Sequence, residues 1–379
     1  MLFLGFSAGL PFLLVFSTLN ARLADVGVET ATIGFFSWLG ITYSIKVFWA
    51  PVVDRLKLPV LDRLFGKRRS WILLAQAGIA TGLYLMSQTN ALAAPETLAL
   101  FGLLVAFSSA TQDVAIDAYR IEIAQERLQA ALAATYIFGY RLALLVAGAG
   151  ALYVAEFWSW EVSYQVMAAL VGVGALTVLI VKEPEVNHFA AAQDIAHRIE
   201  EEVEKRSHLP ERLARLTGWF YAAVTGPFLD FFRRYRELAV AILVLVAVYR
   251  ISDIAMGVMA NPFYLDLGFS KDDIAQIGKL FGFVCTMIGA FLGGALVVRF
   301  GILRPLILGA VMVAATNLLF AYLATLGADK TWLAIVISAD NISAGISNSV
   351  FIAFLSSLVN QSYTATQYAL FSSLMTLPG

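Results

Sequence analysis

Two carboxylates in an apolar segment are the first residues in this sequence whose types and spacing suggest chemistry. Asp113 and Asp117 lie four residues apart in the apolar run near 97–119, which places both on one face of a helix. Because an apolar environment favours the neutral form of a carboxyl group, we interpret Asp113, with Asp117, as a site that binds and releases protons. Arg120 follows Asp117 by about one helical turn. An alternative interpretation is therefore an Asp117–Arg120 ion pair that holds a gate at the membrane surface.

Polar residues in other apolar segments predict a site for a hydrophilic, charged solute. Arg141 lies 12 residues after Gln129, near the middle of its segment, where only a cavity gives access to water. Its guanidinium group fits carboxylates, so Arg141 is the residue that we most expect to bind an anion. Lys46 can bind a substrate carboxylate or offset Asp113, although its side chain can also extend to the membrane surface. The predicted substrate-binding residues, which we expect to line a polar cavity between two halves of the chain, are Tyr43, Lys46, Gln112, Tyr140, Arg141, Arg250, Asp253, Asp340, Asn341 and Gln367.

The elements that position these residues are apolar helices. Hydrophobic residues make up 60% of the 379 residues and charged residues only 14%, whereas a soluble domain has about 25% charged residues. A helix that crosses a bilayer needs about 20 largely apolar residues. The sequence therefore predicts an all-α polytopic membrane protein. We expect ten complete spans and a shorter apolar segment at 364–379; the spans lie near 2–24, 31–52, 70–88, 97–119, 130–155, 162–181, 238–260, 273–298, 302–324 and 332–358.

Basic residues in the short loops predict the orientation of the chain. The segment between the second and third spans holds Arg55, Lys57, Arg63, Lys67, Arg68 and Arg69. Because Lys and Arg concentrate in cytoplasmic loops, the N-terminus is predicted to be cytoplasmic. We expect a gate on this side that consists of Asp54, Arg55, Arg68, Arg69 and Arg120.

A polar insert at 183–236 divides the chain into a six-helix bundle at 1–182 and an incomplete second bundle at 237–379. Basic and aromatic residues alternate over 209–232, which predicts an amphipathic helix on the inner membrane surface with its Lys and Arg facing anionic lipid. A short internal repeat supports two halves. Asp25-Val26-Gly27 and Asp266-Leu267-Gly268 each follow the first span of a half, and each has an Ile six residues after the Gly. Parallel six-helix halves are the plan of the major facilitator superfamily.

Several classes of function have no support in the sequence. The net charge of −1 gives no indication of nucleic-acid binding, and the single cysteine, Cys285, offers neither a disulfide nor metal-ligand spacing. There is no phosphate-binding loop, no HExxH and no nucleophile elbow. We therefore predict a monomeric transporter without cofactor, metal or catalytic residues, and not an enzyme.

Several motifs resemble the AmpG muropeptide permease family. They are Ser7-Ala8-Gly9-Leu10-Pro11, the run from Ile45 to Arg55, Gly66-Lys67-Arg68-Arg69-Ser70-Trp71, Gly139-Tyr140-Arg141 and the run from Tyr363 to Leu370. The most specific is Ala110-Thr111-Gln112-Asp113-Val114-Ala115-Ile116-Asp117-Ala118-Tyr119-Arg120. The resemblance covers essentially the whole chain. Since the superfamily plan has twelve helices and this sequence stops within the eleventh, we expect the chain to be truncated at its C-terminus.

The resemblance implies a secondary transporter of the Gram-negative inner membrane. Such a protein imports GlcNAc-anhydro-N-acetylmuramyl peptides from periplasm to cytoplasm with protons, for peptidoglycan recycling, and in some bacteria the imported fragments control β-lactamase induction and so antibiotic resistance. Gln112 and Asn341 suit the hydrogen bonds of sugars, and Arg141 or Lys46 suits peptide carboxylates. Two alternatives remain: a transporter of another large anion, such as a CoA thioester or a siderophore, and a non-transporting membrane sensor or assembly protein.

Overall fold

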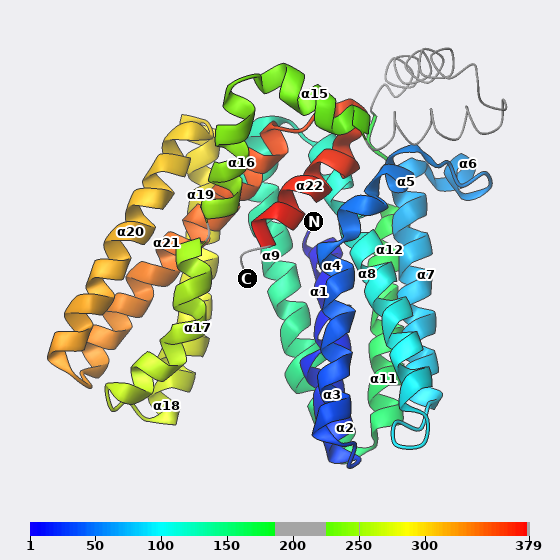
Figure 1. Cartoon of the computed structure of the whole chain (residues 1–379), viewed down its shortest axis with the longest axis horizontal. Coiled ribbons are helices and arrows are strands. Elements are labelled where there is room, and N and C mark those ends of the chain that lie inside the picture. The colour runs from blue at the N-terminus through cyan, green and yellow to red at the C-terminus, as the bar shows by residue number, and fades with distance from the viewer. Residues whose placement is uncertain (186–224, 250, 377–379) are drawn as a thin grey trace. The chain divides into compact units, whose positions relative to one another are not determined.

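The computed structural model describes residues 1–185, 225–249 and 251–376 (Figure 1). These residues form helices and no strand. Eight of the helical stretches are long and apolar enough to cross a membrane, or nine if the bent pair Thr30–Ser44 and Lys46–Arg55 is one span. The prediction of an all-α, multi-pass protein is confirmed.

The expected number of ten spans stays a prediction. The expected span near 238–260 corresponds to two helices in the described residues, α16 (Leu238–Val248) and α17 (Ile251–Asp266). The last apolar segment forms α22 (Thr364–Thr376). The surface helix predicted over 209–232 lies mostly outside the described residues, and its end overlaps α15 (Gly226–Tyr235).

Among the described residues the chain forms two compact units. The first comprises Met1–Ile123, Tyr136–Val240 and Val359–Ser373, and the second comprises Ala124–Thr135, Ala241–Leu358 and the segment that begins at Leu374. The first unit thus includes the start of α22, which the division into 1–182, 183–236 and 237–379 places with the second bundle. That sequence division stays a prediction.

The first unit contains the helices that carry most of the predicted site. They are α1 (Leu2–Val15), α2 (Ser17–Asp25), α3 (Thr30–Phe36), α4 (Ile41–Ser44), α5 (Ala50–Arg55), α6 (Leu61–Phe65), α7 (Lys67–Gln88), α8 (Pro95–Ile123), α9 (Gln129–Leu145, from Tyr136 on), α10 (Ala151–Phe157), α11 (Trp160–Leu170) and α12 (Gly172–Ile180). Leu10, Leu14 and Leu19 lie in its core with Leu83 and Tyr164, all completely buried.

Glycines set how closely α1 and α9 approach each other. A Cβ atom on Gly139 would lie 1.9 Å from the carbonyl oxygen of Leu2, and one on Gly5 would lie 2.1 Å from that of Tyr136. Only glycine fits at such backbone contacts, so small residues let these two helices pack closely. The contact holds α9 directly against α1 around Tyr136 and Gly139.

The second unit is built around α19 (Gly282–Phe300), α20 (Leu303–Leu326) and α21 (Lys330–Ser357). A Cβ atom on Gly289 would lie 2.2 Å from the Ile342 carbonyl oxygen, and one on Gly345 would lie 2.2 Å from that of Thr286. The pair α19 and α21 therefore also packs through glycines, and a core that includes Phe320 and Leu333 lies beside it.

Candidate functional site

One face of α8 carries three polar residues at regular spacing. Ser109, Asp113 and Asp117 follow one another at intervals of four residues and so share this face. Asp113 is half-buried, and its Oδ1 atom is inaccessible to water and has no hydrogen-bond partner in the described structure. Buried polar atoms are almost always hydrogen-bonded, so an exception calls for an explanation such as an exchangeable ligand.

Tyr43 of α4 and Lys46 in the 3₁₀ turn Lys46–Phe48 lie across from this face. The Tyr43 hydroxyl lies next to that of Ser109, yet neither oxygen has a hydrogen-bond partner with normal geometry in the part of the chain that the structure describes. Three buried polar atoms without a hydrogen bond of normal geometry thus gather in one region. The arrangement can accept a proton, a water molecule or a hydroxyl group of a solute.

Lys46 supplies positive charge to the same region. Its charge acts on both Asp113 and Asp117, and the half-buried lysine makes no ion pair with a described residue. Tyr140 of α9 lies within electrostatic reach of Asp113. The structure therefore brings four predicted residues, Tyr43, Lys46, Asp113 and Tyr140, into one neighbourhood.

Asp117 differs from Asp113 because it has a partner. The Oδ1 atom of Asp117 lies 3.5 Å from Nη2 of Arg120, whose side chain is completely buried. The Arg120 guanidinium also lies over the ring of Tyr368 in α22, 5.2 Å from its centroid. The geometry thus gives Asp117 an ion-pair partner, whereas Asp113 has none in the described structure; proton binding by either carboxylate stays a prediction.

Gln112 faces away from the Asp113 face and into the helix packing. Its Oε1 atom accepts a hydrogen bond from the Ser7 hydroxyl at 3.0 Å, and its Nε2 donates to the Ser7 carbonyl oxygen at 3.0 Å. Gln76 of α7 donates to the same hydroxyl at 3.1 Å. Because the Gln112 amide joins α8 to α1 in this way, its contact with substrate stays a prediction without support from the geometry.

Arg141 has no partner within the described chain. Its side chain is exposed and takes part in no hydrogen bond or ion pair with a described residue. In the second unit, Asp340 accepts a hydrogen bond from the Thr316 hydroxyl at 3.2 Å, and Asn341 accepts one from the Thr286 hydroxyl at 2.8 Å. Arg250 and the side chain of Asp253 lie outside the described residues.

One of the predicted gate residues, Asp54, binds the start of α22 directly. The Asp54 carboxylate accepts hydrogen bonds from the backbone N–H groups of Ala365 (3.0 Å) and Thr366 (2.6 Å) and from the Thr366 hydroxyl (2.6 Å). The first N–H groups of a helix have no partner within the helix, and an acidic residue there also interacts favourably with the helix dipole. Asp54 therefore caps α22 from α5.

A buried ion-pair network holds Asp54 in place. Arg68 donates to Asp54 at 2.9 Å and makes two hydrogen bonds to Glu122, at 2.6 and 2.9 Å. Arg69 donates to the carbonyl oxygens of Val178 (2.7 Å) and Leu179 at the end of α12. The guanidinium of Arg55 lies 5.8 Å from the ring centroid of Tyr363.

Helix α15 contacts α22 through Gln367. Its Oε1 atom accepts hydrogen bonds from Arg234 (2.9 Å) and from the backbone N–H of Asn360 (2.8 Å). Its Nε2 donates to the Pro227 carbonyl oxygen (2.9 Å) and to Asp230 (3.0 Å). Both ends of the Gln367 amide thus join α22 to α15, so its predicted role in substrate binding has no support from this geometry.

Sequence reasoning missed several partners of the predicted residues. One of them is Glu122, which follows Arg120 by two positions and binds Arg68 of the basic loop. A search of the predicted helix ends for carboxylates that could pair with this loop could have found it. Glu183 accepts hydrogen bonds from the first backbone N–H groups of α7, those of Arg68 (2.7 Å) and Arg69 (3.1 Å). Burial raises the pKa of Glu183, and these hydrogen bonds lower it in part. Only the folded chain reveals this contact, because the partners are more than 100 positions apart in the sequence.

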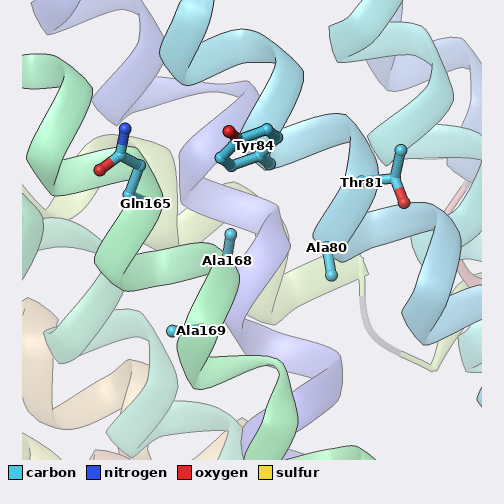
Figure 2. Close-up of a pocket in the computed structure, with 6 residues that line it drawn as sticks. All are labelled: Ala80, Thr81, Tyr84, Gln165, Ala168 and Ala169. Atoms are coloured by element: carbon cyan, nitrogen blue, oxygen red, sulfur yellow. The ribbon is translucent and has the colours of Figure 1, made fainter.

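A groove on the first unit lies between α7 and α11. Figure 2 shows Thr81 and Tyr84 on α7 and Gln165 on α11, with Ala80, Ala168 and Ala169 also lining it. None of the predicted site residues lines this groove. The candidate site is therefore the region of Tyr43, Lys46, Asp113 and Tyr140.

Comparison with known proteins shows the class of protein to which the chain belongs. The family model of the Major Facilitator Superfamily matches residues 1–379. The solved structure of the proton:xylose symporter XylE bound to 6-bromo-6-deoxy-D-glucose shares this fold, with a TM-score of 0.63 at 14% identity over 100% of this chain and 84% of that chain. The described chain is thus a multi-pass membrane transporter rather than an enzyme.

Two relatives show to which family of this superfamily the chain belongs. The chain is 34% identical over 376 residues to a Rickettsia felis protein that carries the name AmpG 4, covering 99% of this chain and 85% of that protein. It is 30% identical over 376 residues to the anhydromuropeptide permease of Escherichia coli K12, covering 99% of this chain and 70% of the relative. The chain belongs to the AmpG permease family of the major facilitator superfamily.

Proposed function

We propose that the protein is a secondary active transporter that imports GlcNAc-anhydro-N-acetylmuramyl peptides from periplasm to cytoplasm with protons, across a bacterial inner membrane, for peptidoglycan recycling. The observation that carries the proposal is Asp113, a carboxylate in a membrane span whose buried oxygen lacks a hydrogen-bond partner in the described structure. Ionisable groups inside a membrane mark ion pathways and proton relays. The name of the Escherichia coli relative, an anhydromuropeptide permease, supports the choice of solute.

Lys46 can couple the proton to the solute. When Asp113 is ionised, its negative charge offsets that of Lys46. Protonation of Asp113 removes this negative charge, and Lys46 then attracts a carboxylate of the peptide more strongly. Proton binding and solute binding therefore favour each other, which is what symport requires.

Arg141 supplies a second cation for the peptide. It is exposed and has no described partner, and its planar guanidinium can bind a carboxylate through two hydrogen bonds. Lys46 and Arg141 are the two cations of the first unit that we propose for the peptide carboxylates.

Uptake into proteoliposomes tests the proposal. With an inward proton gradient, wild-type protein should accumulate labelled anhydromuropeptide, and Asp113→Asn should abolish this accumulation but keep counterflow, which needs no net proton movement. Asp266→Asn, which changes an exposed carboxylate at the end of α17, should behave like wild type.

The alternatives give different outcomes in the same assay. Accumulation of a CoA thioester or a siderophore, but of no muropeptide, would show another large anion as the solute. Binding without flux of any solute would indicate a membrane sensor. Accumulation by Asp113→Asn at the wild-type level would refute the role of Asp113.

A further inference from the structure

Four aromatic rings from neighbouring helices meet beside the Asp113 region. Phe12 of α1 lies 4.9 Å from Phe16, which links α1 to α2, and 5.7 Å from Tyr43 of α4, measured between ring centroids. Phe16 lies 5.9 Å from Tyr43, and Phe12 lies 6.5 Å from Tyr140 of α9. We refer to Phe12, Phe16, Tyr43 and Tyr140 as the aromatic wall.

The aromatic wall is not the interior of the core. Core residues of the first unit, such as Leu10 and Leu14, are completely buried, and Phe16 and Tyr43 pack only against the edge of that cluster. All four rings of the wall are half-buried, so each leaves part of its surface uncovered in the described structure.

Polar groups that can bind sugar hydroxyls lie next to these rings. One oxygen of Asp113 lacks a hydrogen-bond partner in the described part of the chain, and the hydroxyls of Tyr43 and Ser109 lie next to each other without a hydrogen bond of normal geometry. Ligand sites typically combine aromatic side chains with a few polar groups that fix orientation. Uncovered rings beside hydroxyl and carboxylate groups match a pyranose, which has apolar C–H faces and hydroxyls around its edge.

We propose that the aromatic wall is the sugar subsite of the transporter, where pyranose rings of the solute pack on Phe12 and Phe16 while Tyr43, Ser109 and Asp113 bind their hydroxyls. The faces of aromatic rings carry negative charge density and attract the weakly positive C–H groups of a sugar. The proposal rests on the proposed function in one respect, that the solute carries sugar. It places the disaccharide on this wall and the peptide carboxylates at Lys46 or Arg141.

Competition with parts of the solute tests the proposal. Uptake of labelled anhydromuropeptide is measured with increasing amounts of the peptide-free disaccharide or of the free stem peptide. In Phe12→Ala or Phe16→Ala, the inhibition constant of the disaccharide should rise about two- to tenfold, the factor that one aromatic contact contributes. The inhibition constant of the free peptide should not change. Phe12→Tyr keeps the ring and should retain wild-type values.

An exposed aromatic pair on another helix provides a matched control. Tyr153 of α10 lies 4.6 Å from Phe157 and is 64% exposed. Tyr153→Ala removes a ring of similar size and should leave both inhibition constants unchanged. If the variants at Phe12 and Phe16 weaken both competitors equally, or neither, the wall is not a sugar subsite.

Direct binding separates this proposal from the proposed function. Binding of the disaccharide to the purified protein is measured by calorimetry, in wild type and Phe12→Ala. Binding that weakens in Phe12→Ala, with no uptake of muropeptide by wild type, contradicts only the proposed transport. Uptake with an unchanged disaccharide constant contradicts only the subsite, and absence of both uptake and binding overturns both.

Discussion

Removal of the Asp54 carboxylate should free the start of α22. In Asp54→Ala, three hydrogen bonds to α22 disappear, those from the backbone N–H groups of Ala365 and Thr366 and from the Thr366 hydroxyl. Loss of a side-chain cap costs about 0.5–2 kcal/mol, and loss of a charge at a helix N-terminus adds about 0.3–1 kcal/mol. The ion pair with Arg68 is also lost.

The free-energy cost of Asp54→Ala should be smaller than the cost of breaking an ordinary buried ion pair. Removal of one partner of such a pair typically costs about 3–5 kcal/mol, because the other charge is left unpaired. Here Arg68 keeps Glu122, to which it makes two hydrogen bonds of 2.6 and 2.9 Å. We therefore expect Asp54→Ala to weaken the attachment of α22 by about 2–3 kcal/mol.

Cysteine labelling measures this attachment directly. Ala369 of α22 is 2% exposed and lies in a cluster with Ala50 and Val53. In a Cys285→Ala background, Ala369→Cys should react slowly with a maleimide, because reaction requires α22 to move away from α5. A loss of 2 kcal/mol should make the labelling about 30-fold faster.

A neighbouring carboxylate provides the control. Asp62 of α6 lies in the same loop region and makes no hydrogen bond to α22. Asp62→Ala changes the net charge by the same amount and should leave the labelling rate unchanged. Equal labelling rates in Asp54→Ala and Asp62→Ala, in protein that unfolds at the wild-type temperature, would refute the assignment of Asp54 as the cap of α22.

Three further predictions concern other contacts of the first unit. Gly139→Ala places a Cβ atom 1.9 Å from the Leu2 carbonyl oxygen and should lower the stability by about 1–3 kcal/mol or more in thermal unfolding, whereas Gly172→Ala, which meets nothing within 4 Å, should have little effect. Asp230→Ala removes the acceptor for Asn360, Gln367 and Arg234 and should expose α15 to trypsin cleavage at Arg233, whereas Glu237→Ala should leave the cleavage rate unchanged. Burial raises the pKa of Glu183 in the folded chain above its ordinary value of 4.5. Between pH 4.5 and this raised pKa, Glu183 therefore holds more protons in the folded chain than in the unfolded chain. The melting temperature should therefore rise as the pH falls through this raised pKa towards 4.5. Glu183→Gln should remove this trend from the pH profile, and a melting temperature that falls over this range because of Glu183 would contradict the raised pKa.

Hydropathy and spacing predicted the elements of the site well, because both depend on residues close together in sequence. The apolar run near 97–119 forms the centre of α8, and the four-residue spacing places Asp113 and Asp117 on one face. In the basic loop Arg68 makes a buried ion pair with Asp54, and the role of these residues as a gate stays a prediction. These features follow from helical geometry and from the exclusion of charge from apolar surroundings.

The rotation of each helix could not be predicted in the same way. Gln112 and Asp113 are adjacent, yet Gln112 is enclosed by Ser7 and Gln76 while Asp113 keeps an oxygen without a partner in the described structure. Which of two neighbours faces the packing depends on how α8 sits against α1 and α7, and the sequence of α8 alone does not contain this information. The contact of Gln367 with α15 was missed for the same reason.

The internal repeat shows which features both halves must share. Gly27 and Gly268 both have a positive φ, 84° and 92°, at the turn that ends α2 and α17. The same backbone hydrogen bond follows in each copy, from Val28 to Leu23 (2.9 Å) and from Phe269 to Tyr264 (3.1 Å). Glycine is required there because its backbone adopts this conformation without strain, and so the sequence match is strongest at this turn.

The charged and aromatic groups do not follow the repeat. The first unit carries Asp113 and Lys46 beside the aromatic wall, whereas α21 of the second unit carries Asp340 and Asn341, which accept hydrogen bonds from threonines. A backbone turn has to be kept in both copies for each half to fold, whereas charged and aromatic side chains away from the turn are free to differ between the copies.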